Sequence, residues 1–327
     1  MRHVAERAGV SLKTVSRVIN EENGVAEATA AKVYSAIDAL GFQRNDIAAS
    51  LRQGRSTATL GLVLEDLGNP FYSAIARAVE SQANARGYVV IAGSCEEDLE
   101  RERLLVRGLL GRRVDALLLV PAMHERDHTW LARELSGAPV VFLDRPPHRL
   151  AADAVLLDNA GGGRAAAEHL LDQGHTRIAY VGDSDVMWTA SERLGGYTDA
   201  LTAAGVEVDP RLVRTGSHDV IQAAQVVQEL LTLPEHSRPT ALFTANNRQT
   251  VGALHAMRSE ARRPAVVGFD DFELADLLGI TVIRHDPSLM GFEAAALAFA
   301  RIAGEDGLPR VVTVPTELVP RGSGEVA

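Results

Sequence analysis

The chain has 327 residues, a hydrophobic content of 46% and a net charge of −10 at pH 7, and this length predicts two or three folded units with sizeable cores. Its apolar runs fall short of the roughly 20 residues that cross a membrane, and residues 1–20 are too amphipathic and polar for a signal peptide. The single cysteine, Cys95, excludes an intrachain disulfide framework and favours a reducing compartment, so we expect a cytoplasmic protein.

Residues 1–20, MRHVAERAGVSLKTVSRVIN, predict two short helices joined by a tight turn at Gly9. Ala5 is small enough for the helices to cross closely, and Ser11 stands where a helix N-cap is needed. The apolar contacts between the helices are expected from Val4, Ala8, Val15 and Val18. An ordinary helical hairpin is the alternative, but the register of these residues favours a helix-turn-helix. Its second helix would then enter the major groove of DNA.

The acidic net charge does not exclude a nucleic-acid partner, because the charge is unevenly distributed. Residues 1–55 contain eight basic and six acidic side chains and carry +2, whereas the rest of the chain carries −12. Affinity for phosphate depends on the local field at the contact rather than on the total charge. The excess is modest, so we expect salt-dependent DNA binding that needs two copies of this segment.

Residues 27–40 place apolar side chains at helical spacing and predict a third helix, which Gly41 ends. Ala26 cannot cap this helix, so about 1 kcal/mol of capping free energy is expected to be missing there. The next segment predicts a short helix that Asn45 caps and Gly54 breaks. A plain linker is the alternative for this segment.

From Leu60 onward, short apolar runs alternate with amphipathic stretches such as Tyr72–Arg86. Runs rich in Val, Ile and Leu are typical of buried parallel strands covered on both faces by helices. They lie at residues 60–67, 88–94, 114–122, 139–145, 154–158, 177–183, 241–247, 265–271 and 281–286. The runs form two sets, so the predicted fold is an all-α helix-turn-helix head followed by an α/β core of two doubly wound parallel-sheet lobes.

Polar and aromatic side chains gather where these runs end or where helices follow them. Ligands of open α/β sheets lie beyond the carboxyl ends of the strands, so two facing lobes would share one cleft there. The residues expected to line it are Asp66, Phe71, Asp144, Trp188, Arg193, His218, Asn246, Asp270 and His285, with Asn69 and Tyr72 nearby. Carboxylate, amide and guanidinium groups bind vicinal hydroxyls, and an aromatic ring covers the C–H face of a sugar. The set therefore favours a carbohydrate ligand.

Structural alternatives exist for several of these residues. Arg193 could pair with a carboxylate, Asn246 could shape a turn, and Asp270 or its neighbour Asp271 could cap a helix. Residues 161–163 are glycines that precede a predicted helix but lack the lysine and hydroxyl of a P-loop, so we expect a flexible crossover. The pair at residues 96–97 is acidic and is expected to start a helix.

Enzyme chemistry finds no candidate in the sequence. A serine elbow and a Cys/His pairing are both missing, and His169 and His175 have no further ligands around them for zinc. We therefore expect no catalytic residue, no metal and no cofactor. A transport binding protein is a further alternative, but it would need a signal peptide where this chain has a helix-turn-helix.

The segments AGVS and TVSRVIN resemble the DNA-binding start of the lactose/galactose-repressor (LacI/GalR) family of bacterial regulators. The later segments resemble the same family nearly to the C-terminus, which implies a core like that of periplasmic sugar-binding proteins. The expected divisions are a head at 1–44, a hinge helix and linker at 45–56, and a core at 57–327. The resemblance implies lobe crossings near 158, 286 and 314. Lobe 1 would hold 57–157 and 287–313, and lobe 2 would hold 158–286 and 314–327.

The same resemblance implies how the head would contact DNA. Lys13 and Arg17 are candidates to donate to guanine, and Leu12 to touch a thymine methyl. Phosphates would be held by Ser11, Thr14, Ser16 and Asn20. The hinge helix, with Asn45, Ala48 and Leu51, would enter the minor groove, where the leucine wedges into a base step.

For the core, the resemblance matches five of the cleft residues to effector-contacting positions: Phe71, Asp144, Arg193, Asn246 and Asp270. His218 and His285 fall where the family varies. The chain departs from the family at Asn247, where an aspartate is usual. We therefore expect a homodimeric transcription regulator, a repressor, that binds a near-palindromic operator and responds to a sugar or sugar derivative. A nucleobase, a phosphosugar or a protein partner remains an alternative effector.

Overall fold

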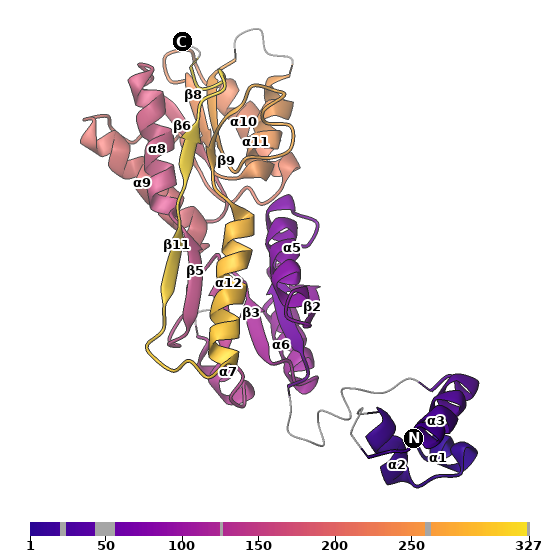
Figure 1. Cartoon of the computed structure of the whole chain (residues 1–327). Coiled ribbons are helices and arrows are strands. Elements are labelled where there is room, and N and C mark those ends of the chain that lie inside the picture. The colour runs from indigo at the N-terminus through magenta and orange to yellow at the C-terminus, as the bar shows by residue number, and fades with distance from the viewer. Residues whose placement is uncertain (20–23, 43–55, 125–126, 259–262, 326–327) are drawn as a thin grey trace. The chain divides into compact units, whose positions relative to one another are not determined.

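The computed structural model describes residues 1–19, 24–42, 56–124, 127–258 and 263–325. The chain forms two compact units, Met1–Thr57 and Ala58–Ala327, whose elements are labelled in Figure 1. Four of the expected DNA-contacting residues lie outside the described ranges, so their roles stay predictions: Asn20, Asn45, Ala48 and Leu51. Within the described ranges, every helix is too short or too polar to cross a lipid bilayer.

In the described residues of the N-terminal unit, three helices surround a small apolar core. They are α1 (Arg2–Ala8), α2 (Leu12–Ile19) and α3 (Glu27–Leu40). Gly9 ends α1 in the left-handed conformation with φ 66°, which a side chain would disfavour. Ala26 precedes α3 without a side-chain capping bond, as the sequence predicted. The core contains Val4, Ala5, Val15, Val18, Val33 and Ala36.

The first lobe of the second unit is a six-stranded sheet in the order β11-β5-β4-β3-β1-β2, with every pair parallel. Its strands are β1 (Thr59–Leu64), β2 (Val89–Ser94), β3 (Ala116–Leu119), β4 (Val140–Leu143), β5 (Asp153–Leu157) and β11 (Val311–Val314). One face packs on α5 (Pro70–Asn84) and α12 (Pro287–Ile302), and the other on α6 (Leu99–Gly111) and α7 (Thr129–Glu134). Successive residues of each strand point to opposite faces of the sheet and therefore pack into two separate cores.

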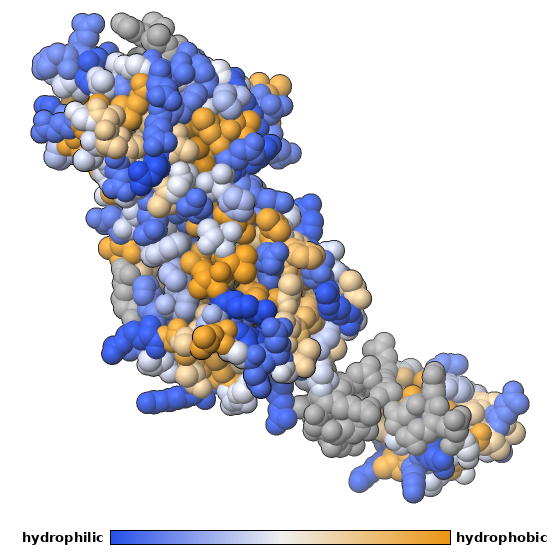
Figure 2. Space-filling view, turned by 60° about the vertical axis from the view of Figure 1, so that its left-hand side comes forward, coloured by the Kyte–Doolittle hydropathy of each residue, from blue (hydrophilic) through white to orange (hydrophobic). Residues whose placement is uncertain are grey.

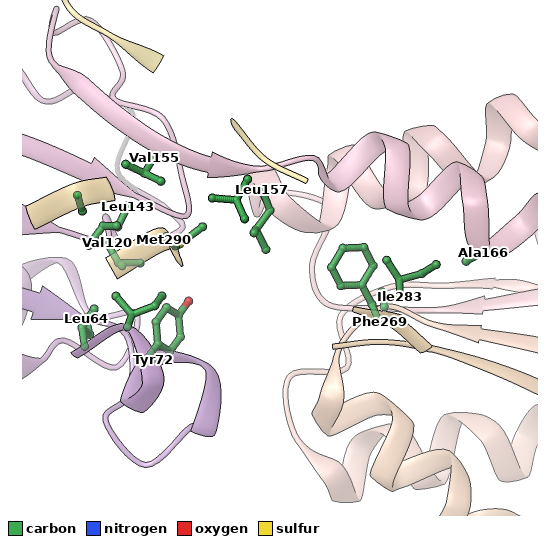
Figure 3. Close-up of a cluster of buried hydrophobic side chains, with 14 of the residues drawn as sticks. Leu64, Tyr72, Val120, Leu143, Val155, Leu157, Ala166, Phe269, Ile283 and Met290 are labelled. Atoms are coloured by element: carbon green, nitrogen blue, oxygen red, sulfur yellow. The ribbon is translucent and has the colours of Figure 1, made fainter. Parts of the chain in front are cut away.

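The second lobe repeats this arrangement in the order β12-β10-β9-β8-β6-β7. Its strands are β6 (Ile178–Val181), β7 (Val213–Arg214), β8 (Ala241–Thr244), β9 (Ala265–Phe269), β10 (Thr281–Arg284) and β12 (Glu317–Val319). One face packs on α8 (Asn159–Asp172) and α9 (Trp188–Ala203), and the other on α10 (Val220–Leu231) and α11 (Asn247–Met257). Figure 3 shows buried side chains of both lobes, including Leu64, Tyr72 and Phe269.

The chain passes between the two sheets after β5, before α12 and between β11 and β12. These three crossover segments lie where the two sheets face one another. The carboxyl ends of the parallel strands in both lobes therefore border a common space. This arrangement brings residues that are far apart in sequence, such as Asp66 and Arg248, into contact.

The nine strands predicted from apolar runs are confirmed, and so is the fold class of two doubly wound lobes after a helical head. Three strands were not predicted, namely β7, β11 and β12, and β12 is antiparallel to β10. Two local expectations are wrong. The glycines at 161–163 lie inside α8, whose N-cap is Asp158, and are no flexible crossover. Glu96 and Glu97 do not start a helix: both have positive φ and precede α6, whose N-cap is Asp98.

Candidate functional site

The second helix of the N-terminal unit has one buried and one open side. Ser11 caps α2, since the Thr14 amide donates to Ser11 Oγ at 3.1 Å, which leaves the start of the helix well ordered. Val15 and Val18 are buried against α1 and α3, whereas Leu12 is 48% exposed and Lys13 is also exposed. An apolar and a basic side chain together on the open N-terminal end are what a recognition helix needs.

The nine expected cleft residues all lie at the facing ends of the two lobes. Asp66 follows β1, Phe71 lies in the first turn of α5, Asp144 follows β4, Trp188 and Arg193 lie in α9, His218 precedes α10, Asn246 caps α11, Asp270 follows β9, and His285 follows β10. They come from both lobes, and the structure brings them into one region.

Arg193 lies at the centre of this region, and its guanidinium is buried and held from three directions. Nε donates to Asn159 Oδ1 at 2.7 Å, and Nη1 donates to the carbonyl of Ala245 at 2.6 Å. The guanidinium carbon of Arg193 lies 3.7 Å from the centroid of the Phe269 ring, which is a cation–π contact. This fixed cation acts electrostatically on both Asp144 and Asp270.

The placement of Arg193 depends on close packing of α8 against α9. A Cβ added at Gly163 would lie 2.2 Å from the Arg193 carbonyl oxygen, and one added at Gly196 would lie 2.0 Å from the Ala160 oxygen. These distances are far below van der Waals contact, so only glycine allows the two backbones to approach so closely. Gly163 of α8 and Gly196 of α9 therefore set the position of the helix that carries Arg193.

Asp144 contributes a buried carboxylate from the first lobe. The residue has φ 64° directly after β4, an unusual backbone conformation for aspartate, and Tyr72 Oη donates to its Oδ2 at 3.1 Å. Burial raises the pKa of Asp144, although the Arg145 and Arg193 guanidinium groups act in the opposite direction. A buried acid with positive φ at a strand end is a candidate for ligand binding.

Asp270 contributes the second buried carboxylate, from the other lobe, with φ 75°. His285 Nε2 lies 2.8 Å from its Oδ1, and the Asn247 amide donates to its Oδ2 at 3.1 Å. Burial alone would raise the pKa of Asp270, but the His285 hydrogen bond and the Arg193 charge together hold it below its ordinary value. Asp270 therefore stays an anion that can accept further hydrogen bonds.

His285 closes the region between two aromatic rings. Its side chain is 2% exposed, with Phe71 of the first lobe edge-on at 5.3 Å and Phe269 at 5.9 Å. Nε2 is bonded to Asp270, whereas Nδ1 is buried with no hydrogen-bond partner among the described residues. A buried ring nitrogen without a partner is costly, so Nδ1 is a candidate to bind a ligand hydroxyl.

Trp188 and His218 lie at the border of the region rather than at its centre. Trp188 lines a small pocket with Arg145 and His148 of the first lobe. His218 Nδ1 lies 3.1 Å from Asp183 Oδ2, and this hydrogen bond raises the pKa of His218. Asn246 Oδ1 accepts from the Gln249 backbone amide at 3.0 Å, so this residue caps α11, whereas the structural alternative was a turn residue.

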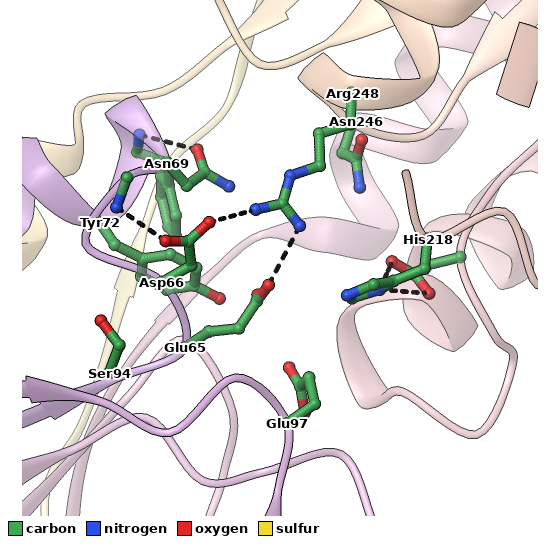
Figure 4. A network of polar contacts seen from close by, with 12 residues as sticks. Glu65, Asp66, Asn69, Tyr72, Ser94, Glu97, His218, Asn246 and Arg248 are labelled. Carbon is green, nitrogen blue, oxygen red and sulfur yellow. Dashed lines mark hydrogen bonds and ion pairs between the residues drawn. The ribbon is translucent and has the colours of Figure 1, made fainter. Parts of the chain in front are cut away.

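Several charged residues of the cleft were missed by sequence reasoning. Arg145 binds Glu97 through two nitrogens at 3.0 and 2.6 Å, and Arg248 reaches across the cleft to Asp66 and Glu65 (Figure 4). Burial raises the pKa of Glu65, while Arg145 opposes this shift. The sequence offered one signal for the Arg248 contact. A cation in the first turn of a helix opposes the helix dipole, so Arg248 could have been expected to have an acidic partner outside α11.

The described cleft carries an excess of negative charge. Its acids are Glu65, Asp66, Glu97, Asp144, Asp183 and Asp270, and its guanidinium groups are Arg145, Arg193 and Arg248. Arg145 and Arg248 are already paired with carboxylates of the cleft. The arrangement can therefore accept many hydrogen bonds from hydroxyl groups, but it holds little unused positive charge for an anion.

Comparisons with known proteins cover both units. The family described as "Bacterial regulatory proteins, lacI family" matches residues 1–45, and "Periplasmic binding proteins and sugar binding domain of LacI family" matches residues 57–321. The ribose operon repressor of Escherichia coli K12 is 32% identical over 99% of both chains. A solved CelR–cellobiose complex is 33% identical over 98% of both chains, with a TM-score of 0.73. The Lac repressor dimer bound to operator and the anti-inducer ONPF is 28% identical, with a TM-score of 0.83 over 99% of this chain and 98% of that one.

Proposed function

The chain belongs to the LacI family of bacterial regulatory proteins, and we propose that it is a repressor whose operator affinity is set by a sugar bound between the two lobes. It is an effector-controlled DNA-binding regulator and not an enzyme. One observation carries the proposal: the capped helix with Leu12 and Lys13 on its open side occurs in the same chain as a cleft that surrounds Arg193 with Asp144 and Asp270.

An uncharged, hydroxyl-rich effector fits the cleft better than an anion does. Asp144 and Asp270 accept hydrogen bonds from hydroxyl groups, and His285 Nδ1 offers a further buried acceptor. A phosphosugar would bring at least one more negative charge into a region whose acids already outnumber its guanidinium groups. The relatives named for ribose and for a cellobiose complex support the carbohydrate class. A nucleobase or a protein partner is the second candidate.

The head would read DNA as a recognition helix does. Lys13 and Arg17 are proposed to donate to guanine and Leu12 to contact a thymine methyl, while Ser11, Thr14, Ser16 and Asn20 would hold phosphates. Asn45, Ala48 and Leu51 are proposed to form the hinge contact in the minor groove. The proposed divisions are 1–44, 45–56 and 57–327, which the matched ranges 1–45 and 57–321 support.

We propose a homodimer, because the near-palindromic operator that we expect would be bound by two heads. We propose that it acts in the cytoplasm, in keeping with its single cysteine, Cys95. The core exposes apolar side chains at two places that a second copy would cover. Val89 and Ile91 lie on the edge strand β2, near Leu67, and a second group lies between β9 and β10 at Leu274, Leu277 and Leu278. Figure 2 shows apolar patches among charged side chains on one face. Exposed apolar patches of this kind mark association surfaces.

A thermal-shift screen tests the effector class. The full-length protein is heated with ribose, cellobiose, their phosphorylated forms and nucleosides in turn, because a ligand that binds the folded state raises the melting temperature. We expect a shift with a neutral sugar and none with its phosphate. A shift with the phosphate alone would exclude the proposed class of effector, and a shift with a nucleoside alone would support the second candidate.

A further inference from the structure

Arg248 makes a charged contact between the two lobes. It is the second residue of α11, after the N-cap Asn246. Nη2 donates to Asp66 Oδ2 at 2.6 Å and Nη1 to Glu65 Oε1 at 3.3 Å. Both acids directly follow β1 of the opposite lobe, and Figure 4 shows the guanidinium extended between them.

The position of Arg248 is unfavourable within its own helix. The first turn of a helix presents unpaired amide groups and the positive end of the dipole, where acids stabilise and cations destabilise. An arginine there is destabilising unless another group compensates for its charge, so we expect a partner outside α11. Glu65 and Asp66 supply that partner from the other lobe.

The neighbouring residue makes a second contact in the same direction. Asn247 Nδ2 donates to Asn69 Oδ1 at 3.1 Å, across the same cleft. An aspartate at 247 could not donate this bond and would oppose a carbonyl oxygen. Meanwhile the Asn247 amide donates to Asp270, which the proposed effector site contains. The first turn of α11 thus contacts the opposite lobe through Asn247 and Arg248. The same turn contributes Asn246 and Asn247 to the proposed effector site.

We propose that Arg248 is a positioning residue that holds the first turn of α11 against Glu65 and Asp66. It thereby couples the proposed effector site to the closing of the two lobes on one another. This inference rests on the proposed function for its biological meaning. The geometry itself does not, because the contact joins the lobes whatever the cleft binds. The pair is partly buried, with the two side chains 25% and 35% exposed, so we expect an effect of about fivefold on local opening.

Hydrogen–deuterium exchange of the full-length protein, without DNA or added ligand, tests this coupling. The variants are Arg248→Gln, which keeps helix propensity, and Asp66→Asn, which keeps an oxygen for the bond that Asp66 Oδ1 accepts from the Gly68 amide. The matched control is Arg164→Gln, because Arg164 binds Asp199 at 2.9 Å between two helices of one lobe. Circular dichroism confirms that each variant is folded.

The decisive readout is exchange in the lobe that was not altered. We expect Arg248→Gln to raise exchange about fivefold in residues 66–73, and Asp66→Asn to do the same in residues 247–252. About 0.5 M salt should bring the wild type towards the variants, because the pair is screened. Changes confined to the altered lobe, or equal changes in Arg164→Gln, would overturn the proposal. Because the measurement uses neither operator nor effector, its failure is distinct from failure of the proposed function.

Discussion

Gly163 of α8 lies against the backbone carbonyl of Arg193 in α9, so closely that a Cβ on the glycine would come 2.2 Å from that oxygen. The contact links two helices whose packing decides where the Arg193 guanidinium lies. It also connects a residue with no chemistry of its own to the centre of the proposed effector site.

Gly163→Ala is expected to separate α8 from α9 and to lower the free energy of unfolding by about 1–3 kcal/mol, since added atoms in a packed contact force backbone shifts. It should also weaken effector binding by moving Arg193. Denaturant unfolding measures the first effect and ligand titration the second. Gly195→Ala is the matched control, because nothing lies within 4 Å of a Cβ there. Equal effects of the two substitutions would disprove the packing argument.

Arg193→Ala is expected to abolish the effector response and to leave operator binding intact. The substitution removes the cation between Asp144 and Asp270 and leaves Asn159 Oδ1 and the Ala245 carbonyl without their donor. These losses should cost about 1–3 kcal/mol of stability as well. Operator titrations with and without the sugar that shifts the wild type provide the measurement. A variant that the sugar still releases fully would place the effector elsewhere.

Lys13→Ala is expected to weaken operator binding by about 1–3 kcal/mol and to relax specificity at one base pair, as loss of a guanine contact does. Lys32→Ala on α3 removes the same charge from another exposed position of the head and serves as control. Titrations against a panel of single-base operator variants separate the outcomes. A uniform loss over all sequences would show that Lys13 holds a phosphate instead.

The His218–Asp183 pair predicts a pH-dependent contribution to stability. The hydrogen bond that His218 Nδ1 donates to the Asp183 carboxylate raises the pKa of His218 above its ordinary value of 6.5. The stabilisation should be complete below that value and should be lost as the pH rises through the raised pKa. His218→Gln should therefore destabilise the protein at acidic pH and have little effect at alkaline pH. The side chain is 41% exposed, so the difference should stay below about 1 kcal/mol.

Chemical denaturation of the wild type and His218→Gln across this pH range provides the measurement, with exposed His236→Gln as control. A destabilisation that does not change with pH would mean that His218 acts through packing and not through its charge.

The sequence predicted nine of the strands because their Val, Ile and Leu runs are continuous, as is typical of a parallel sheet that is covered on both faces. The strands β7 and β12 have two and three residues, too few for a periodic pattern, and so they were missed. The glycines of α8 were wrongly predicted to form a loop. Gly163 is needed for the close packing of α8 against α9, which the local sequence does not indicate. Glycine runs alone favour a loop.

The proposed cleft could be predicted in outline because polar residues at strand ends meet at one edge of a sheet. Its charge network could not. Arg145 binds Glu97 and Arg248 binds Asp66, and these partners are separated by 48 and 182 residues. The second pair joins different lobes. Only the folded structure reveals that both arginines are paired with carboxylates, which favours an uncharged effector over an anion.

The central claim is that the head binds a specific duplex and that a ligand in the core changes this binding. Fluorescence anisotropy of the full-length protein with a symmetric operator selected from genomic fragments, compared with random duplex at physiological salt, tests it most directly. We predict a preference of at least about a thousandfold for the operator, and a change of about tenfold or more when a neutral sugar is added. Equal binding to operator and random duplex, with and without sugars, would contradict the account.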